Sequence, residues 1–195
     1  MIVNHQFSNS PIYFPTWDID KLFLGTFNPS CGQQLDYYYR RKVNGFWKIL
    51  KHYDYNNKYN FNDFNQLKGF MTDKCFGCID VIRSVDFPDI KEKKICGTGY
   101  TDNNLFTVKG FTREYIFEDI KNYIIRNNIT NVFSTWGVRN NPKEFNILLT
   151  DFKVFCTQNE INYTPLDSPS GRLYKGPNID RININWWNSL DQYFQ

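Results

Sequence analysis

The sequence predicts an α/β fold, namely a single-domain three-layer sandwich in which helices flank a central, mainly parallel sheet. Short apolar runs that end in glycine or polar residues are typical of buried strands. Stretches with helical spacing separate these runs, and this alternation favours a parallel sheet with crossover helices. The chain has 195 residues, of which 41% are hydrophobic. That content suffices for one sizeable core, so we expect residues 1–195 to form one domain.

Apolar patterning assigns the elements of the first half of the chain. The run over residues 21–24 predicts a short buried strand that ends at Gly25. Residues 26–41 have no stable period and predict a long loop. Helical spacing resumes over residues 46–52, where one face is apolar. The apolar stretch 78–82 predicts a second strand.

The second half of the chain continues the alternation. A helix is predicted over residues 112–126, with Thr112 as its N-cap. A strand follows over residues 131–136. Residues 142–149 predict a short helix that opens on proline, and the run 152–155 predicts a further strand.

The end of the chain predicts a loop and then a closing helix. Residues 164–177 are rich in Pro, Gly and Ser, and an apolar face begins at Ile179. In parallel sheets, ligands bind beyond the carboxyl ends of the strands. We therefore expect the chemistry in the loops after Leu24, Trp136 and Phe155.

Composition and charge limit the class of protein. Aromatic residues are abundant, with 18 Phe, 13 Tyr and 5 Trp, and the net charge is only +3. This balance excludes a histone-like binder but leaves a polyanionic partner open. No apolar run reaches the ~20 residues that cross a bilayer. Residues 1–6 lack the pattern of a secretory signal, so we expect a cytoplasmic protein without a membrane partner.

Cysteine and histidine usage argues against a metal or cofactor. The five cysteines do not predict a disulfide framework. Cys75 and Cys78 form a C-x-x-C with Cys96 nearby, but a cluster needs a second pair. We therefore expect buried free thiols, no metal and no cofactor. Any triad that needs histidine must take it from His5 or His52, the two histidines in the chain.

The loop after the first predicted strand carries residues suited to a nucleic-acid ligand. Gly25 permits a sharp exit from the strand, and Phe27 can offer a π-face to a planar group. The amides of Asn28 and Asn44 can hold a water or read a base edge. Tyrosines and basic residues follow over residues 37–42, which suits bases and phosphates. The alternative is an ordinary polar loop whose aromatic side chains pack inward.

The register of this region resembles a known enzyme family. Gly25-Thr26-Phe27, Tyr37-Tyr38 and Asn44-x-Phe46-Trp47 match the spacing of G-S-F, Y-Y and N-x-F-W in hypoxanthine-DNA glycosylases. These enzymes belong to the uracil-DNA glycosylase superfamily, together with the mismatch-specific uracil enzymes. Residues 77–82 and 164–170 resemble two later motifs of the same family. The resemblance covers roughly residues 21–190.

The resemblance implies a fold, an activity and a set of site residues. It implies a uracil-DNA glycosylase-like fold and a monomeric, monofunctional enzyme that flips a damaged base out of DNA and hydrolyses its N-glycosidic bond without a metal. The catalytic amide that positions water is Asn44, with Asn28 as the reserve. The substrate-binding residues are Gly25, Thr26, Phe27, Tyr38 and Asp80. The DNA-binding residues are Ser168, Pro169, Ser170, Arg172 and Lys175.

Some positions depart from the family pattern and keep other functions open. Asn28 stands where the family has Pro, Lys42-Val43 replaces His-Pro, and Asp167 stands where a small neutral residue is expected. We predict a DNA glycosylase for uracil, hypoxanthine or a bulkier modified pyrimidine, in repair or against modified foreign DNA. The departures favour the alternative, a non-catalytic nucleic-acid or nucleotide-binding module. A hydrolase of free nucleosides is disfavoured by the basic loop at residues 168–175.

Overall fold

The computed structural model describes residues 1–96, 100–136 and 142–194. Their main sheet is parallel, and its strand order is β3-β2-β6-β7. The four strands are β2 (Lys21–Gly25), β3 (Phe76–Asp80), β6 (Asn131–Ser134) and β7 (Asn162–Pro165). The prediction of an α/β fold with a parallel sheet is thereby confirmed. Among the described residues, no helix has both the length and the apolar character needed to cross a bilayer.

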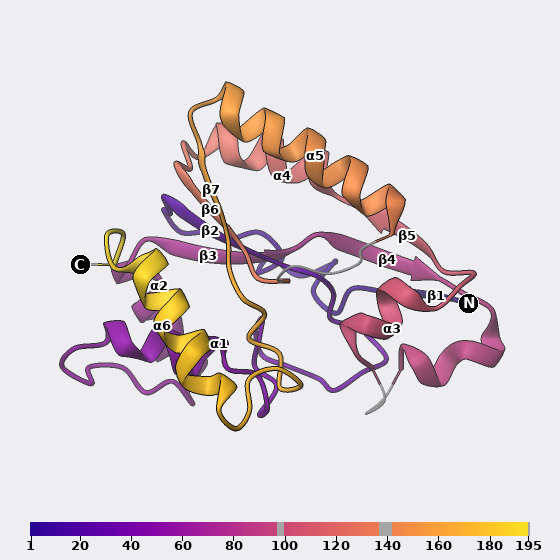
Figure 1. The fold of residues 1–195 in the computed structure, drawn as a ribbon, viewed down its shortest axis with the longest axis horizontal. Coiled ribbons are helices and arrows are strands. Elements are labelled where there is room, and N and C mark those ends of the chain that lie inside the picture. The colour runs from indigo at the N-terminus through magenta and orange to yellow at the C-terminus, as the bar shows by residue number, and fades with distance from the viewer. Residues whose placement is uncertain (97–99, 137–141, 195) are drawn as a thin grey trace.

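Helices cover both faces of the parallel sheet (Figure 1). One face carries α4 (Phe117–Arg126) and α5 (Lys143–Gln158). The opposite face carries α1 (Phe46–Leu50), α2 (Phe64–Asp73) and α6 (Asn178–Leu190). The remaining helical segments are short: the 3₁₀ turns η1 (Lys51–Tyr53) and η2 (Asp89–Lys94), and the helix α3 (Asp102–Thr107). All residues of β2 are buried, because the sheet is covered from both sides.

A cluster of aromatic rings joins the sheet to α1 and α6. Phe23 of β2 stacks on Phe133 of β6, with ring centroids 4.9 Å apart. The same ring meets Phe46 of α1 edge-on at 5.2 Å and stacks on Trp186 of α6 at 6.1 Å. The predicted helices at residues 46 and 179 therefore bury their apolar faces against one strand. Both predictions are confirmed.

A second, antiparallel sheet lies beside the first and was not predicted. Its strand order is β1-β4-β5, with β1 (Ile2–Asn4), β4 (Ile82–Asp86) and β5 (Thr112–Tyr115). The predicted strand at residues 78–82 is thus two strands in two sheets, which meet at Val81. The amide of Val81 donates to the carbonyl oxygen of Gly25 at 3.0 Å. The chain can cross between the sheets there because the loop after β2 supplies the missing backbone partner.

Three predicted elements of the second half are wrong in type or position. Residues 152–155 are not a strand but the middle of α5, which buries Phe145, Phe152 and Cys156 at helical spacing. The strand that follows α5 is β7, and its second half, residues 164–165, was predicted as loop. Thr112 is not an N-cap, because it lies in β5 and the helix begins only at Phe117.

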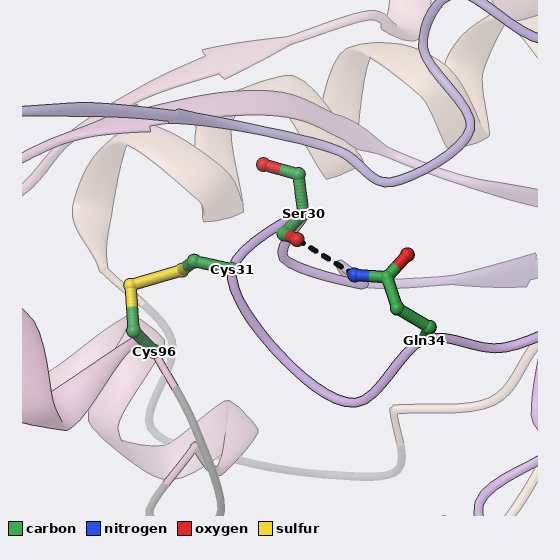
Figure 2. Close-up of a disulfide and its surroundings, with 4 residues drawn as sticks. All are labelled: Ser30, Cys31, Gln34 and Cys96. Atoms are coloured by element: carbon green, nitrogen blue, oxygen red, sulfur yellow. Dashed lines mark hydrogen bonds between the residues drawn. A yellow bond between two sulfur atoms is a disulfide. The ribbon is translucent and has the colours of Figure 1, made fainter.

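The cysteines also differ from expectation. Cys31, in the loop after β2, forms a disulfide with Cys96, which follows η2 (Figure 2). Cys75 is a free and exposed thiol, whereas Cys78 and Cys156 are free and buried. The prediction of buried free thiols is therefore correct for Cys78 and wrong for Cys75 and Cys96. The two cysteines of the disulfide are 65 residues apart in sequence, so their spacing gives no local signal.

Candidate functional site

The candidate site begins where the parallel strands end. Gly25 at the end of β2 pairs in register with Asp80 at the end of β3. On the other side of β2, Leu24 pairs with Ser134, and Thr135 follows directly. The loops after two of the predicted strands therefore start at one edge of the sheet, as expected. The rest of the loop after Trp136, residues 137–141, lies outside the described residues.

A buried histidine holds the carboxylate at this edge. Nε2 of His5 lies 2.9 Å from Oδ2 of Asp80, and both side chains are almost fully buried. Nδ1 of His5 accepts the backbone N–H of Phe7 at 3.1 Å. Nδ1 therefore carries no proton, and Nε2–H donates to the Asp80 carboxylate. The backbone amide of His5 is itself fixed, because it donates to the carbonyl oxygen of Arg83 at 2.6 Å.

The space above Gly25 is occupied by two polar groups. A Cβ atom at this position would overlap Oδ1 of Asp80 and would lie 2.5 Å from the hydroxyl oxygen of Tyr39. The Tyr39 hydroxyl lies 3.0 Å from Oγ1 of Thr135, which in turn donates to the carbonyl oxygen of Leu24 at 3.1 Å. Since the threonine proton is used there, Tyr39 is the donor to Thr135. Glycine is required at position 25 because these groups pass so close to its Cα.

Tyr39 adopts an unusual backbone conformation to reach this position. Its φ is 59°, which is uncommon for a residue with a side chain. Its ring stacks on Phe46 of α1 with centroids 4.1 Å apart. Such strained residues persist where surrounding contacts determine them, often at functional sites. We call His5, Gly25, Tyr39, Asp80 and Thr135 the sheet-edge cluster.

Phe27 and Tyr38, the aromatic residues predicted to bind the substrate, lie inside the protein. Phe27 is 3% exposed and packs against His5 and Tyr100, whose hydroxyl donates to the Phe27 carbonyl oxygen at 2.9 Å. Tyr38 is fully buried, and its hydroxyl donates to the carbonyl oxygen of Tyr13 at 2.9 Å. Burial raises the pKa of Tyr38 well above its usual range. A planar ligand reaches the face of Phe27 only if a neighbouring side chain moves.

The other predicted residues of this loop are held mainly through the backbone. The carbonyl oxygen of Thr26, a nearly buried residue, accepts the amide of Ile82 at 3.1 Å. The carbonyl oxygen of Asn28 accepts the amide of Gln6 at 2.7 Å. The side chain of Asn28 is half-buried and has no hydrogen-bond partner among the described residues.

Asn44 stands at the head of α1. Its Oδ1 accepts the backbone N–H of Phe46 at 2.9 Å, which starts the helix. The side chain remains half-exposed, so Nδ2–H₂ and the second lone pair of Oδ1 can face a ligand. Asn44 thus keeps the functional groups needed to position a water molecule.

The predicted DNA-binding loop docks beside Asn44. The amide of Gly45 donates to the carbonyl oxygen of Pro169 at 2.7 Å. A Cβ atom on Gly171 would lie 2.5 Å from the Cβ of Val43, so only glycine fits there. We call residues 43–46 and 168–174 the paired segments. They are far apart in sequence but in contact with each other, and both lie below the sheet in Figure 1.

Some charged side chains near the paired segments form ion pairs within the protein and others do not. Asp167 accepts hydrogen bonds from Arg181 at 3.0 Å and Asn185 at 2.8 Å, both on α6, so its carboxylate is neutralised within the protein. Ser168 and Pro169 are buried and Ser170 is half-buried. Five exposed cations that lie within or near these segments in sequence form no ion pair with a described residue: Lys42, Lys48, Lys51, Arg172 and Lys175. We call these five the basic surface.

Other features of the described residues lie away from this site. A groove of about 410 Å³ lies between α4 and α5, on the opposite side of the sheet from α1 and α6. No group of three or more His, Cys, Asp or Glu side chains within the described residues is arranged to hold a metal ion.

His5, Tyr39 and Thr135 were not among the predicted site residues. The scarcity of histidine had restricted any histidine-dependent site to His5 or His52, but it did not indicate which residue the histidine contacts.

No protein-family model matches the chain, and no match is found among curated proteins.

Proposed function

We propose that the protein is a monofunctional DNA glycosylase that flips a deaminated or otherwise modified base out of DNA and hydrolyses its N-glycosidic bond. The observation that carries the proposal is the contact between the paired segments, through the Gly45 amide and the Pro169 carbonyl oxygen. The first segment holds the candidate water-positioning residue and the second holds the candidate phosphate contacts. A glycosylase needs both functions close together, because the backbone must be held where the target nucleotide is flipped out.

The chemistry of the site suits the departure of a base. The sugar acquires oxocarbenium character in the transition state, so nearby negative charge stabilises it. The Asp80 carboxylate, held by His5 at the sheet edge, supplies such charge. The half-exposed amide of Asn44 orients the attacking water. Backbone N–H groups of the loop after β2 are suited to receive the negative charge that develops on the departing base.

The basic surface suits the DNA backbone. Exposed lysine and arginine side chains without internal ion pairs release counterions when they bind phosphates. Arg172 and Lys175 follow the buried Ser168-Pro169 turn, which fixes where the loop projects. The internal pairing of Asp167 removes the repulsion that a free carboxylate would exert on phosphates.

The test is base excision itself. Oligonucleotides that carry a single uracil, hypoxanthine or bulkier modified pyrimidine are incubated with the protein, and abasic sites are cleaved with alkali. We expect nicks at the modified position for at least one substrate, and no nicks with Asn44→Ala. An absence of nicks with every substrate, in single and double strands alike, would reject the proposal.

One observation favours the alternative of a non-catalytic nucleic-acid-binding module. Phe27 and Tyr38, the candidate base-binding aromatics, are buried. A module that binds only the backbone through the basic surface needs neither side chain exposed. It would bind DNA with a steep salt dependence and leave every substrate intact, which the same incubation combined with a salt titration distinguishes.

A further inference from the structure

The disulfide fastens two segments that each have their own hydrogen bonds. Cys31 lies in a turn where the Gly32 amide donates to the Pro29 carbonyl oxygen at 3.0 Å. The side chain of Gln34 donates to the carbonyl oxygen of Ser30 at 2.9 Å, which Figure 2 shows beside the disulfide. The turn is also tied to β1, because the Ser30 amide donates to the Asn4 carbonyl oxygen at 2.9 Å. The turn therefore does not depend on the disulfide for its shape.

The segment on the other side of the disulfide is similarly self-sufficient. The amides of Ile95 and Cys96 donate to the Glu92 carbonyl oxygen at 2.9 and 2.8 Å, closing the end of η2. The side chain of Ile95 is fully buried and anchors the segment in the core. Cleavage of the disulfide would release Cys96 from the turn. Each segment would keep its fold but lose the restraint that the other imposes, so both would open more often.

The disulfide is also open to reagents in solution. Cys31 is exposed and Cys96 is half-buried. The buried thiols of Cys78 and Cys156 are poor competitors for exchange, because burial raises the pKa of each and thereby suppresses its thiolate. The pKa of Cys156 rises to about 11.

We propose that Cys31–Cys96 is a reversible oxidation site, at which low-molecular-weight thiols release η2 from the turn after β2 and the corresponding small disulfides attach it again. A thiolate attacks Sγ of Cys31, forming a mixed disulfide and releasing the Cys96 thiolate, which takes up a proton. A second thiol attacks the mixed disulfide and releases Cys31. Two small thiols thus become one small disulfide, while the protein gains two electrons and two protons.

The site would act at the border of the sheet-edge cluster. The turn that holds Cys31 directly follows Phe27 and Asn28. The carbonyl oxygen of Phe27 accepts from Tyr100, which lies beyond Cys96 in the chain. The inference goes beyond the proposed function, and its readouts do not depend on base excision.

The first experiment counts accessible thiols across a series of reduced to oxidised glutathione ratios. The folded protein is equilibrated in each buffer, alkylated with iodoacetamide and analysed by peptide mass spectrometry. We expect one modified cysteine on the oxidised protein, the exposed Cys75, which carries either the alkyl group or glutathione. The reduced protein should carry three alkyl groups, at Cys75, Cys31 and Cys96. The change should reverse when oxidised glutathione is restored.

Matched variants identify the source of each adduct. Cys75→Ser should remove the constant adduct and leave the redox-dependent pair unchanged. Two outcomes would overturn the proposal. One is a count that stays at one under strongly reducing conditions. The other is a count that rises to five, since labelling of Cys78 and Cys156 means that reduction unfolds the whole protein.

The second experiment locates the structural change by amide hydrogen exchange. In reduced wild type, we expect faster exchange confined to residues 92–96 and 29–34, with β2 and β6 still protected. Cys31→Ser should reproduce this pattern without reductant. If β2 and β6 lose protection as well, the disulfide is a staple of the entire fold and not a local switch. If no amide changes, Cys96 is held by other contacts and the proposal also fails.

Discussion

The two halves of the candidate site differ in how they are held. The sheet-edge cluster is formed by side chains that are fixed by strand register and by burial, as the contact between His5 and Asp80 illustrates. The paired segments are held by the backbone hydrogen bond from Gly45 to Pro169, and they leave Asn44 half-exposed and Arg172 exposed. A buried polar group is fixed strongly because the dry surroundings make its loss costly. The comparison separates a buried half, fixed by its own polar contacts, from an open half that is joined through the backbone.

The largest effect on stability is expected for His5→Ala. Removal of the ring leaves a cavity and takes a hydrogen bond from the buried Asp80 carboxylate, so stability should fall by about 3 kcal/mol. Chemical denaturation measures this loss. His5→Gln, which keeps an N–H donor on its side chain, should recover part of the stability and of any excision activity. His52→Ala, at an exposed histidine, is the matched control and should change little. If His5→Ala were as stable as wild type, the contact between His5 and Asp80 would not be what holds the sheet-edge cluster.

The next effect is expected for Asn44→Ala and concerns rate. Loss of a single polar group that acts in the transition state should slow excision by about 10²–10³-fold, or about 2.7–4 kcal/mol. DNA binding should change little, because no phosphate contact is lost. Single-turnover kinetics and a binding titration separate the two quantities. Asn122→Ala, on the exposed face of α4, serves as the control. Normal turnover in Asn44→Ala together with an inactive Asn28→Ala would move the role to Asn28.

A smaller effect is expected for Phe27→Ala. If a flipped base stacks on this ring, productive binding should weaken by about 1–3 kcal/mol. Binding to an oligonucleotide with an abasic site should suffer less, because no base is present to stack. The ratio of the two affinities isolates stacking from a general loss of stability. Equal losses on both oligonucleotides would assign Phe27 to the core, as its burial alone suggests.

A still smaller effect is expected on the basic surface. Arg172→Ala should weaken binding to all DNA sequences about equally, since a phosphate contact carries no sequence information. The slope of log K against log salt should flatten by roughly one unit, and Lys175→Ala should behave likewise. Arg126→Ala, at the end of α4 on the other side of the sheet, is the control. Unchanged slopes for both Arg172→Ala and Lys175→Ala would exclude this loop from the DNA interface.

A fifth prediction concerns Asp167, whose carboxylate is already paired with Arg181. A free carboxylate beside phosphates would weaken binding, so its removal would tighten non-specific DNA binding. Because this one is neutralised within the protein, Asp167→Asn should change the affinity by less than either cationic variant. A salt titration on the same duplex measures this. Clearly tighter binding would mean that the carboxylate acts on the DNA in spite of its partner.

The sequence predicted elements well where one apolar pattern had one structural meaning. The run at residues 21–24 is bounded by Gly25, and the helical spacing after Ile179 spans several turns. The run at residues 152–155 failed because four apolar or amphipathic residues fit either a strand or one turn of a longer helix. The stretch at 78–82 failed differently. It bends at Val81, and its two ends pair with different sheets, because pairing is not a local property.

The sequence by itself identified the loop after β2 as the candidate region, and it showed which residue types this loop carries. Glycine, aromatic residues and amides at those positions follow from local chemistry. The tertiary structure alone decided that His5 meets Asp80, that Tyr39 rather than Tyr38 reaches the sheet edge, and that Cys31 bonds to Cys96. The reason is physical. Each of these contacts joins residues that are distant in sequence or depends on backbone torsion, and the register of β1 on β4 and of β2 on β3 brings the partners together.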